Sequence, residues 1–181
     1  MNRDWQPLWL VPAVALVAPA AHGTQYLTTT QAQKLLFADA SRFAEHPLTL
    51  TDAQKDAIRK LSGVRQRQDS QPVWSAMKDG ERLGWFIVDD VVGKHEYITY
   101  AAALSPQGEV IGVEILNYRE THGGEVRQAD WRANFAGKSL QDTLRLGRDI
   151  PNISGATLSC RNLTDGVRRL LALQQVALRD A

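Results

Sequence analysis

Short apolar runs alternate with polar positions through the middle of the chain, from residue 72 to residue 118. The runs are rich in β-branched and aromatic residues, and this composition with a period of two is typical of strands. Short turns at 79–81 and 105–108 join neighbouring runs in antiparallel order. The pattern predicts an antiparallel meander, with strands beginning at Val73 and spanning Leu83–Val92, Tyr97–Leu104 and Glu109–Leu116.

The preceding residues, 24–71, follow a helical period instead. An apolar stripe predicts one peripheral helix over 31–46, which the next residue, a proline, would end. A second helix begins after Thr51, since a glutamine three residues later gives the spacing of a capping box, and Gly63 is placed to end it. The polar stretch 65–71 is expected to be a linker.

A final helix is predicted over 159–178, after a long connection at 119–153. Connections of that length often hold short elements or function, and residues 131–135 are expected to form a helical turn. One face of the final helix carries Leu163, Val167, Leu170 and Leu171, while Arg161, Asp165, Arg168 and Arg169 are expected to lie off that face. The fold class is therefore α+β: an antiparallel β-sheet meander packed against a C-terminal helix, with N-terminal helices.

Composition limits the number of domains, the kinds of partner and the cysteine chemistry that the chain can have. The chain has 181 residues, which suffice for one domain with a good core, and its net charge of +1 gives no reason to expect a nucleic-acid partner. The single cysteine, Cys160, excludes an internal disulfide. It is expected to be a small buried residue, with a reactive thiol at a helix N-terminus as the alternative.

The first residues are typical of an export signal. An apolar run over 8–18 is too short to span a bilayer comfortably, and Pro12 interrupts it. Small residues at Ala21 and Gly23 occupy the positions that a signal peptidase reads. We expect residues 1–23 to be a cleaved signal peptide and the protein to be periplasmic or extracytoplasmic. An uncleaved membrane anchor is the alternative.

The stretch with the clearest chemistry is Ser-Gly-Ala-Thr at 154–157, directly before the final helix. The first N–H groups of a helix have no intrahelical partner, and the positive end of the helix dipole favours a phosphate group there. Ser154, Thr157 or Ser159 could also act simply as the N-cap of the helix, with Gly155 in a tight turn. Both interpretations use the same unsatisfied N–H groups.

This motif and its surroundings resemble the FMN-binding domains of the C subunit of the sodium-pumping NADH:quinone oxidoreductase, the Rnf G subunit and small exported flavoproteins. The resemblance runs from about Glu96 to Leu173 and includes Arg119–Gly124, Trp131 and Phe135–Lys138. In that family a dedicated flavin transferase links FMN, through its phosphate, to the threonine that ends the motif. The resemblance implies covalent FMN on Thr157, with Ser154, Gly155, Ala156, Leu158 and Ser159 around it.

The resemblance also implies further contacts with the flavin. Glu120, Thr121 and His122 lie in the shared loop, and Trp131 or Tyr118 could provide an aromatic wall. Arg148, together with Arg145 and Arg161, is near enough in sequence to pair with the phosphate, although solvated surface positions would explain all three. One departure from the family is Asn152, where members often carry an acidic residue; the nearest acid upstream is Asp149.

The predicted organisation is a signal peptide or anchor at 1–23, a helical segment at 24–71 and an FMN-binding domain at 72–181. The expected function is electron transfer by a redox carrier, with a flavin transferase, redox partner proteins and a membrane electron-transfer complex as partners. The alternatives are a noncovalent flavin or small-ligand module and an accessory subunit of a membrane redox complex. A hydrolase is more distant, because Ser154 lacks the preceding glycine of a nucleophile elbow, and no metal-ligand motif is present.

Overall fold

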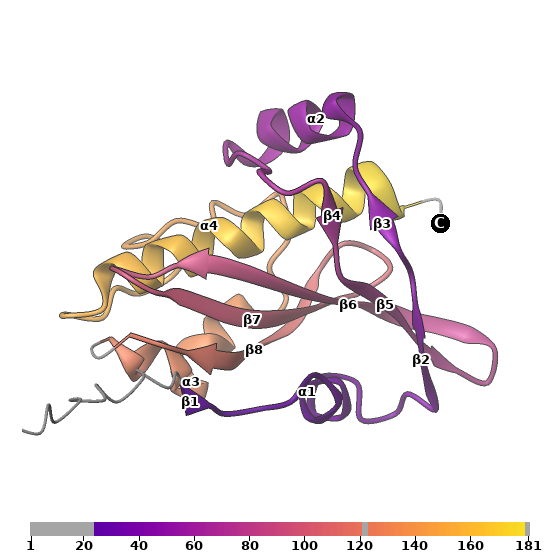
Figure 1. The fold of residues 1–181 in the computed structure, drawn as a ribbon, viewed down its shortest axis with the longest axis horizontal. Helices are drawn as coiled ribbons and strands as arrows, with labels where there is room; N and C mark the ends of the chain where they lie inside the picture. The colour runs from indigo at the N-terminus through magenta and orange to yellow at the C-terminus, as the bar shows by residue number, and fades with distance from the viewer. Residues whose placement is uncertain (1–23, 121–122, 180–181) are drawn as a thin grey trace, which may run out of the picture.

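The computed structural model describes residues 24–120 and 123–179 (Figure 1). Its centre is an antiparallel sheet of six strands in the order β1-β8-β7-β6-β5-β2. The strands are β1 (Thr24–Gln25), β2 (Arg42–Glu45), β5 (Val73–Lys78), β6 (Glu81–Val92), β7 (Tyr97–Leu104) and β8 (Val110–Tyr118). Strands β5 to β8 follow one another in sequence and in space, so the predicted meander and the α+β fold class are confirmed.

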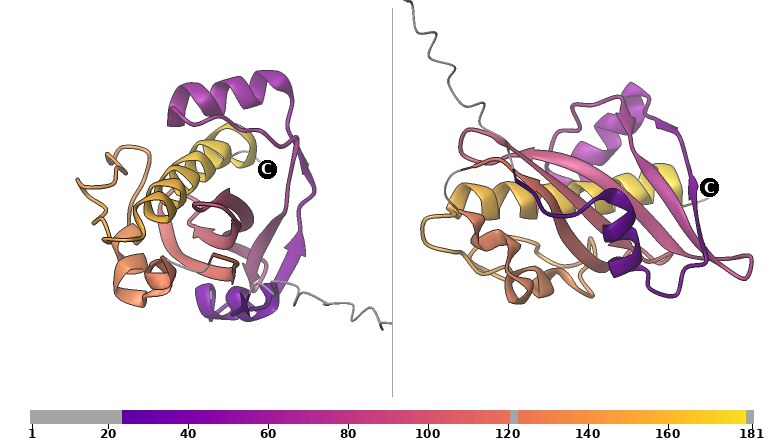
Figure 2. Two further views of the ribbon diagram at one scale, coloured as in Figure 1. Left: turned by 60° about the vertical axis from the view of Figure 1, so that its left-hand side comes forward. Right: turned by 60° about the horizontal axis from the view of Figure 1, so that its bottom comes forward.

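Helices cover both faces of this sheet. Helix α4 (Thr157–Leu173) crosses one face, α1 (Thr29–Leu36) lies on the other, and α2 (Asp52–Ser62) lies outside α4. Figure 2, left, shows the resulting order of layers from α2 through α4 and the sheet to α1. A small second sheet joins β3 (Leu48–Thr49) to β4 (Ser70–Gln71) beside α2.

The period of two along the strands sorts their side chains between two cores. Trp85 and Ile87 of β6 belong to the larger core under α4, whereas Phe86, between them, belongs to the smaller core under α1. The predicted face of the final helix is buried as expected, through Leu163, Val167, Leu170 and Leu171. Cys160 is also buried, and burial raises the pKa of its thiol, which contradicts the reactive-thiol alternative.

The helix predicted over 31–46 is wrong in its second half. Helix α1 ends at Leu36, and residues 42–45 form the edge strand β2, which pairs with β5. Phe43 still contacts the core under α1, as the apolar stripe required, but it does so from a strand. The long-range pairing with β5 outweighs the local helical pattern.

The second N-terminal helix follows the prediction closely. The Thr51 side chain accepts a hydrogen bond from the backbone N–H of Gln54, and the Gln54 side chain accepts one from the N–H of Thr51. Gly63 ends α2 with a left-handed φ of 70°, a conformation that glycine adopts without steric cost. Both predicted ends of this helix are therefore confirmed.

The stretch predicted as a polar linker, 65–71, is partly buried and contributes β4. Arg169, expected off the apolar face of α4, is only 7% exposed and forms an ion pair with Asp89 of β6. Gln66 accepts a hydrogen bond from Arg169, and the Tyr100 hydroxyl donates to Asp89 over 2.6 Å. These polar partners explain why part of 65–71 and the Arg169 side chain are buried, because hydrogen bonds and an ion pair let amide and charged groups enter the interior.

The long connection after β8 holds short elements, as predicted. It contains the 3-10 turn η1 (Gly124–Arg127), the single-turn helix α3 (Ala129–Arg132) and a second 3-10 turn, η2 (Ala133–Phe135). After α4 the chain continues as a π-helix, η3 (Gln174–Leu178). The connection and the start of α4 lie at the same end of the sheet (Figure 1).

Candidate functional site

The motif at 154–157 forms the turn from which α4 starts. Gly155 has a φ of 85°, and a Cβ atom added to it would meet no atom within 4 Å. The N-cap is Ala156, and no side chain of residues 24–120 and 123–179 caps the first turn. The expectation that Ser154, Thr157 or Ser159 caps the helix is therefore wrong, since Thr157 is already the first helical residue.

The side chains of this first turn divide between solvent and core. Ser154 is exposed, Thr157 is half-buried and Leu158 is 44% exposed. Ala156 and Ser159 are buried and fix the turn to the rest of the domain. Thr157 is therefore a partly exposed residue on a helix start that is held in place by buried neighbours.

Tyr118, at the end of β8, lies under the turn. Its hydroxyl is 3.3 Å from the Ser159 hydroxyl. Burial raises the pKa of Tyr118, although its hydrogen bond with Ser159 opposes that shift. A Cβ on Gly123 would lie 2.9 Å from the Tyr118 hydroxyl and 3.3 Å from Ala156, so only glycine lets this loop approach the motif so closely.

Trp131 anchors the residues that lead into the motif. The indole Nε1 donates a hydrogen bond of 2.8 Å to the carbonyl of Pro151, and the ring packs edge-on against Phe135. Trp131 is only 5% exposed. Its structural role is thus clear, while contact of its ring with a flavin stays a prediction.

Glu120 connects the shared loop to the turn between β6 and β7. Its Oε1 accepts hydrogen bonds from the backbone N–H groups of His95 and Glu96. Partial burial opposes ionisation, but these hydrogen bonds outweigh it and lower the pKa of Glu120. Thr121 and His122, which were expected near the flavin, lie outside the described residues.

The cations expected near a phosphate are all exposed. Arg148 and Arg145 lie in the loop before the motif, and Arg161 lies one helical turn after Thr157. Residues four apart on a helix are neighbours, so Arg161 can reach a group carried by Thr157. Among the residues described, none of these three guanidinium groups has an ion-pair partner.

The acid nearest the motif, Asp149, is engaged within its own loop. Its carboxylate accepts hydrogen bonds of 2.8 Å from the backbone N–H groups of Leu144 and Arg145. Burial opposes ionisation, yet these bonds outweigh it and lower the pKa of Asp149. Asn152, by contrast, is exposed, so the position of the departure from the family faces solvent.

Two supports of the site could not be found from sequence alone. Asn162, on α4, donates to the carbonyl of Val92 and so ties the start of the helix to the β6–β7 turn. The contact between Tyr118 and Ser159 likewise joins residues far apart in the chain. Neither pair belongs to a local motif, and only the topology brings the partners together.

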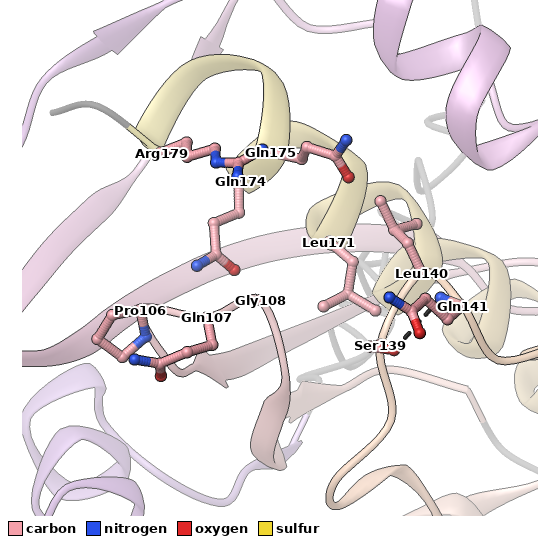
Figure 3. Close-up of a pocket in the computed structure, with 10 residues that line it drawn as sticks. All are labelled: Pro106, Gln107, Gly108, Ser139, Leu140, Gln141, Leu171, Gln174, Gln175 and Arg179. Atoms are coloured by element: carbon pink, nitrogen blue, oxygen red, sulfur yellow. Dashed lines mark hydrogen bonds between the residues drawn. The ribbon is translucent and has the colours of Figure 1, made fainter.

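Two cavities of the described structure have no residue of the motif in their lining. One of about 490 Å³ is at the far end of α4, beside Leu171 and Gln174 (Figure 3), and one of about 460 Å³ borders Asn162 and Arg169. No cluster of three His, Cys, Asp or Glu side chains suited to a metal occurs in residues 24–120 and 123–179. Within the same ranges, no helix combines the length and the hydropathy that a membrane span needs.

Comparison with known proteins agrees with this arrangement. Residues 93–172 match the model of the FMN-binding domain. That range includes β7, β8, the long connection, the motif and nearly all of α4. The match therefore includes the motif, Tyr118, Gly123 and Trp131.

Similar proteins are named as parts of a larger complex. The chain is 30% identical over 113 residues to the G subunit of the ion-translocating oxidoreductase complex of Stutzerimonas stutzeri, covering 56% of this chain and 50% of that protein. It is 29% identical over 140 residues to the protein of the same name from Shewanella loihica, covering 71% and 62%. The chain thus spans only half to three fifths of the length of these relatives.

A solved structure shares the fold. The crystal structure of NqrC from Shewanella oneidensis superimposes with a TM-score of 0.56 at 17% identity, over 79% of this chain and 87% of that one. The α+β architecture is thus found in a known protein, and the family match locates the motif within it. Residues 93–172 thus match the FMN-binding domain family, and these findings together support an FMN-binding domain of the type found in these proteins.

Proposed function

We propose that the protein carries FMN bound covalently to Thr157 by a phosphoester bond and acts as an exported electron carrier. The observation that supports this most strongly is the position of Thr157, a partly exposed residue on the first turn of α4, which no described side chain caps. Uncapped N–H groups and the helix dipole favour an anion at this point, and a phosphodiester keeps one negative charge there.

The residues around Thr157 would hold the group rather than react with it. Arg161 is placed to pair with a phosphate oxygen, and Gly155 leaves open space beside the turn. Tyr118, Ser159 and Trp131 keep the turn fixed from below. Bound FMN supplies the electron chemistry, and the chain supplies attachment and orientation.

Attachment requires a separate flavin transferase and an activated flavin phosphate. In this step a bond forms between the Thr157 oxygen and phosphorus, while the bond from phosphorus to the leaving phosphate group breaks. The hydroxyl proton departs as well, so the protein gains the mass of FMN minus water. The exposed position of Ser154 and the half-buried position of Thr157 leave the turn accessible to another protein.

Export and assembly complete the proposal. Residues 1–23 would direct the chain out of the cytoplasm or anchor it, and the carrier would serve a membrane electron-transfer complex, as the names of its relatives suggest. A tethered cofactor suits this setting, because a nucleotide lost outside the cytoplasm is not easily replaced.

The decisive experiment is export of the protein together with a flavin transferase, followed by denaturation, intact mass measurement and in-gel fluorescence. We expect a gain of FMN minus water that Thr157→Ala abolishes. Ser154→Ala is the matched control, because it removes a neighbouring hydroxyl and should keep the full mass gain.

The main alternative is a domain that holds flavin without a covalent bond. It predicts that denaturation releases all flavin and that Thr157→Ala changes neither the colour nor the mass of the protein. Unmodified protein after coexpression, or a mass gain that survives Thr157→Ala, would refute attachment at this residue.

A further inference from the structure

A cavity of about 490 Å³ lies at the end of α4 opposite the motif (Figure 3). Leu171, which forms one wall, follows Thr157 by about 21 Å along the helix axis at 1.5 Å per residue. The opposite wall comes from the β7–β8 turn, at Gln107 and Gly108, and a third from Leu140. A ligand here would be remote from a flavin on Thr157.

Gln174 reaches into this space from the start of the π-helix η3 (Figure 3). Its Nε2 donates a hydrogen bond of 2.6 Å to the carbonyl of Ser105, which fixes the orientation of the amide because the opposite orientation would place two acceptors together. The residue is only 3% exposed, and its Oε1 has no hydrogen-bond partner among the described residues. A buried acceptor without a donor is unfavourable, so a ligand N–H here would be stabilised.

The π-helix brings a cation to the same side. Residues five apart are hydrogen-bonded neighbours in a π-helix, so Arg179 follows Gln174 on one side of η3. Arg179 is exposed and lines the cavity. Single π-turns are rare and occur frequently at functional sites.

The lining selects for ligand charge and shape. Among the described residues that line the cavity, Arg179 is the one that carries a charge, so an anion is favoured over a cation. Leu140 and Leu171 provide an apolar surface between the polar groups. Gln107, Gln141 and Gln175 are exposed and form the rim, which leaves the cavity open to solvent.

We propose that this cavity binds the carboxyl-terminal residue of a partner polypeptide. The free carboxylate pairs with Arg179, the backbone N–H of the same residue donates to Gln174 Oε1, and its apolar side chain packs on Leu140 and Leu171. A residue inside a peptide chain lacks the backbone carboxylate that Arg179 favours. Such a contact would hold the carrier in a complex while the end of α4 that carries the flavin stays free. This role rests on the proposed function. The binding of a carboxyl-terminal residue does not depend on it.

The test uses N-acetyl-L-leucine as the probe and the purified full-length chain, followed by NMR. Saturable shifts are expected at the Gln174 side-chain amide and at the Leu171 methyl groups. N-acetyl-L-leucinamide, which lacks the carboxylate, should bind at least tenfold more weakly, and so should the probe to Arg179→Gln. Arg42→Gln is the matched control, because it removes an exposed arginine that does not line the cavity and should bind as the unmodified chain does.

Gln174→Leu tests the N–H contact and should weaken the probe while the melting transition shows that the protein is still folded. Equal binding of the acid and the amide, shifts confined to other surfaces, or no shift at millimolar probe would overturn the proposal. Self-association that the probe reverses would also overturn it, because the occupant would then be a second copy of this chain. Thr157→Ala should leave probe binding unchanged, so loss of the flavin and loss of this site are distinguishable.

Discussion

The first turn of α4 and its middle differ in almost every respect, although they belong to one helix. The first turn has no capping side chain among the described residues, and its first residue, Thr157, is partly exposed. The middle buries Arg169 in an ion pair with Asp89, with Tyr100 and Gln66 completing the hydrogen bonds. Among the described residues, the helix thus has no side-chain cap at its first turn, whereas the charge of Arg169 in its middle is paired inside the protein.

The buried charges of Arg169 and Asp89 compensate each other. Burial disfavours the charged form of Arg169, but the negative charge of Asp89 outweighs that effect and raises the arginine pKa. Burial, together with Asp89, also raises the pKa of Tyr100 well above its usual value, so the phenol stays protonated and donates to Asp89. The middle of the helix is therefore a stability element, in contrast to the accessible surface of its first turn.

The largest effect should come from breaking the middle. Asp89→Asn leaves Arg169 buried without a counter-charge, and we expect a loss of about 3–5 kcal/mol in the free energy of unfolding, measured by urea denaturation. Asp165→Asn is the control on the same helix, because its pair with Arg168 is partly exposed and should contribute less than about 1 kcal/mol. Similar small losses in both variants would show that the buried pair of Asp89 with Arg169 contributes no more to stability than the partly exposed pair of Asp165 with Arg168.

A smaller effect should come from loosening the support of the first turn. Trp131→Phe leaves the Pro151 carbonyl without its donor, and we expect a loss of about 1–2 kcal/mol. Hydrogen exchange should become faster at the amides of Ala156 and Cys160, since the segment before them is less fixed. Trp74→Phe is the control, because this half-buried indole makes no hydrogen bond in the described structure. Equal rates of hydrogen exchange at the motif in both variants would argue against the anchoring role of Trp131.

The smallest effect should be a pH dependence at Glu120. Its folded pKa is lowered, so its stabilising contribution is present above the unfolded pKa and is lost as the pH falls through the folded pKa. Glu120→Gln should therefore reduce the loss of stability between neutral and acidic pH, by at most about 0.5 kcal/mol because solvent screens this side chain. Urea midpoints measured across that range test the prediction, and identical pH profiles would show that the Glu120 contacts with His95 and Glu96 contribute nothing.

Sequence reasoning succeeded where the signal is local. The four strands of the meander have β-branched residues in a period of two, and the capping box at Thr51 specifies its helix start directly. It failed at residues 42–45, because the spacing of Phe37, Ala40 and Ala44 suits a helix, while pairing with β5 is non-local. The charge of Arg169 likewise indicated a surface position, and only the fold provides the partner that permits burial.

For the site, sequence located the motif but not its supports. The turn at 154–157 and the helix after it were identified from four residues, whereas the contacts of Tyr118 with Ser159 and of Trp131 with Pro151 depend on the folded chain. Glu120 shows the limit of such reasoning: the structure gives it two backbone partners that the sequence did not indicate, and its contact with a flavin stays a prediction. A position in a functional loop does not separate binding residues from residues that shape the loop.

The pairing of β1 with β8 has a consequence for the timing of folding during synthesis. Thr24 lies opposite Tyr118 in the sheet, so this edge strand leaves the ribosome well before its partner exists. At about 5–20 residues per second, the interval is roughly 5–19 seconds, and α4 follows later still. Over that period the chain has neither a complete sheet nor a complete core. A translocation channel that accepts only unfolded polypeptides could therefore still take it up.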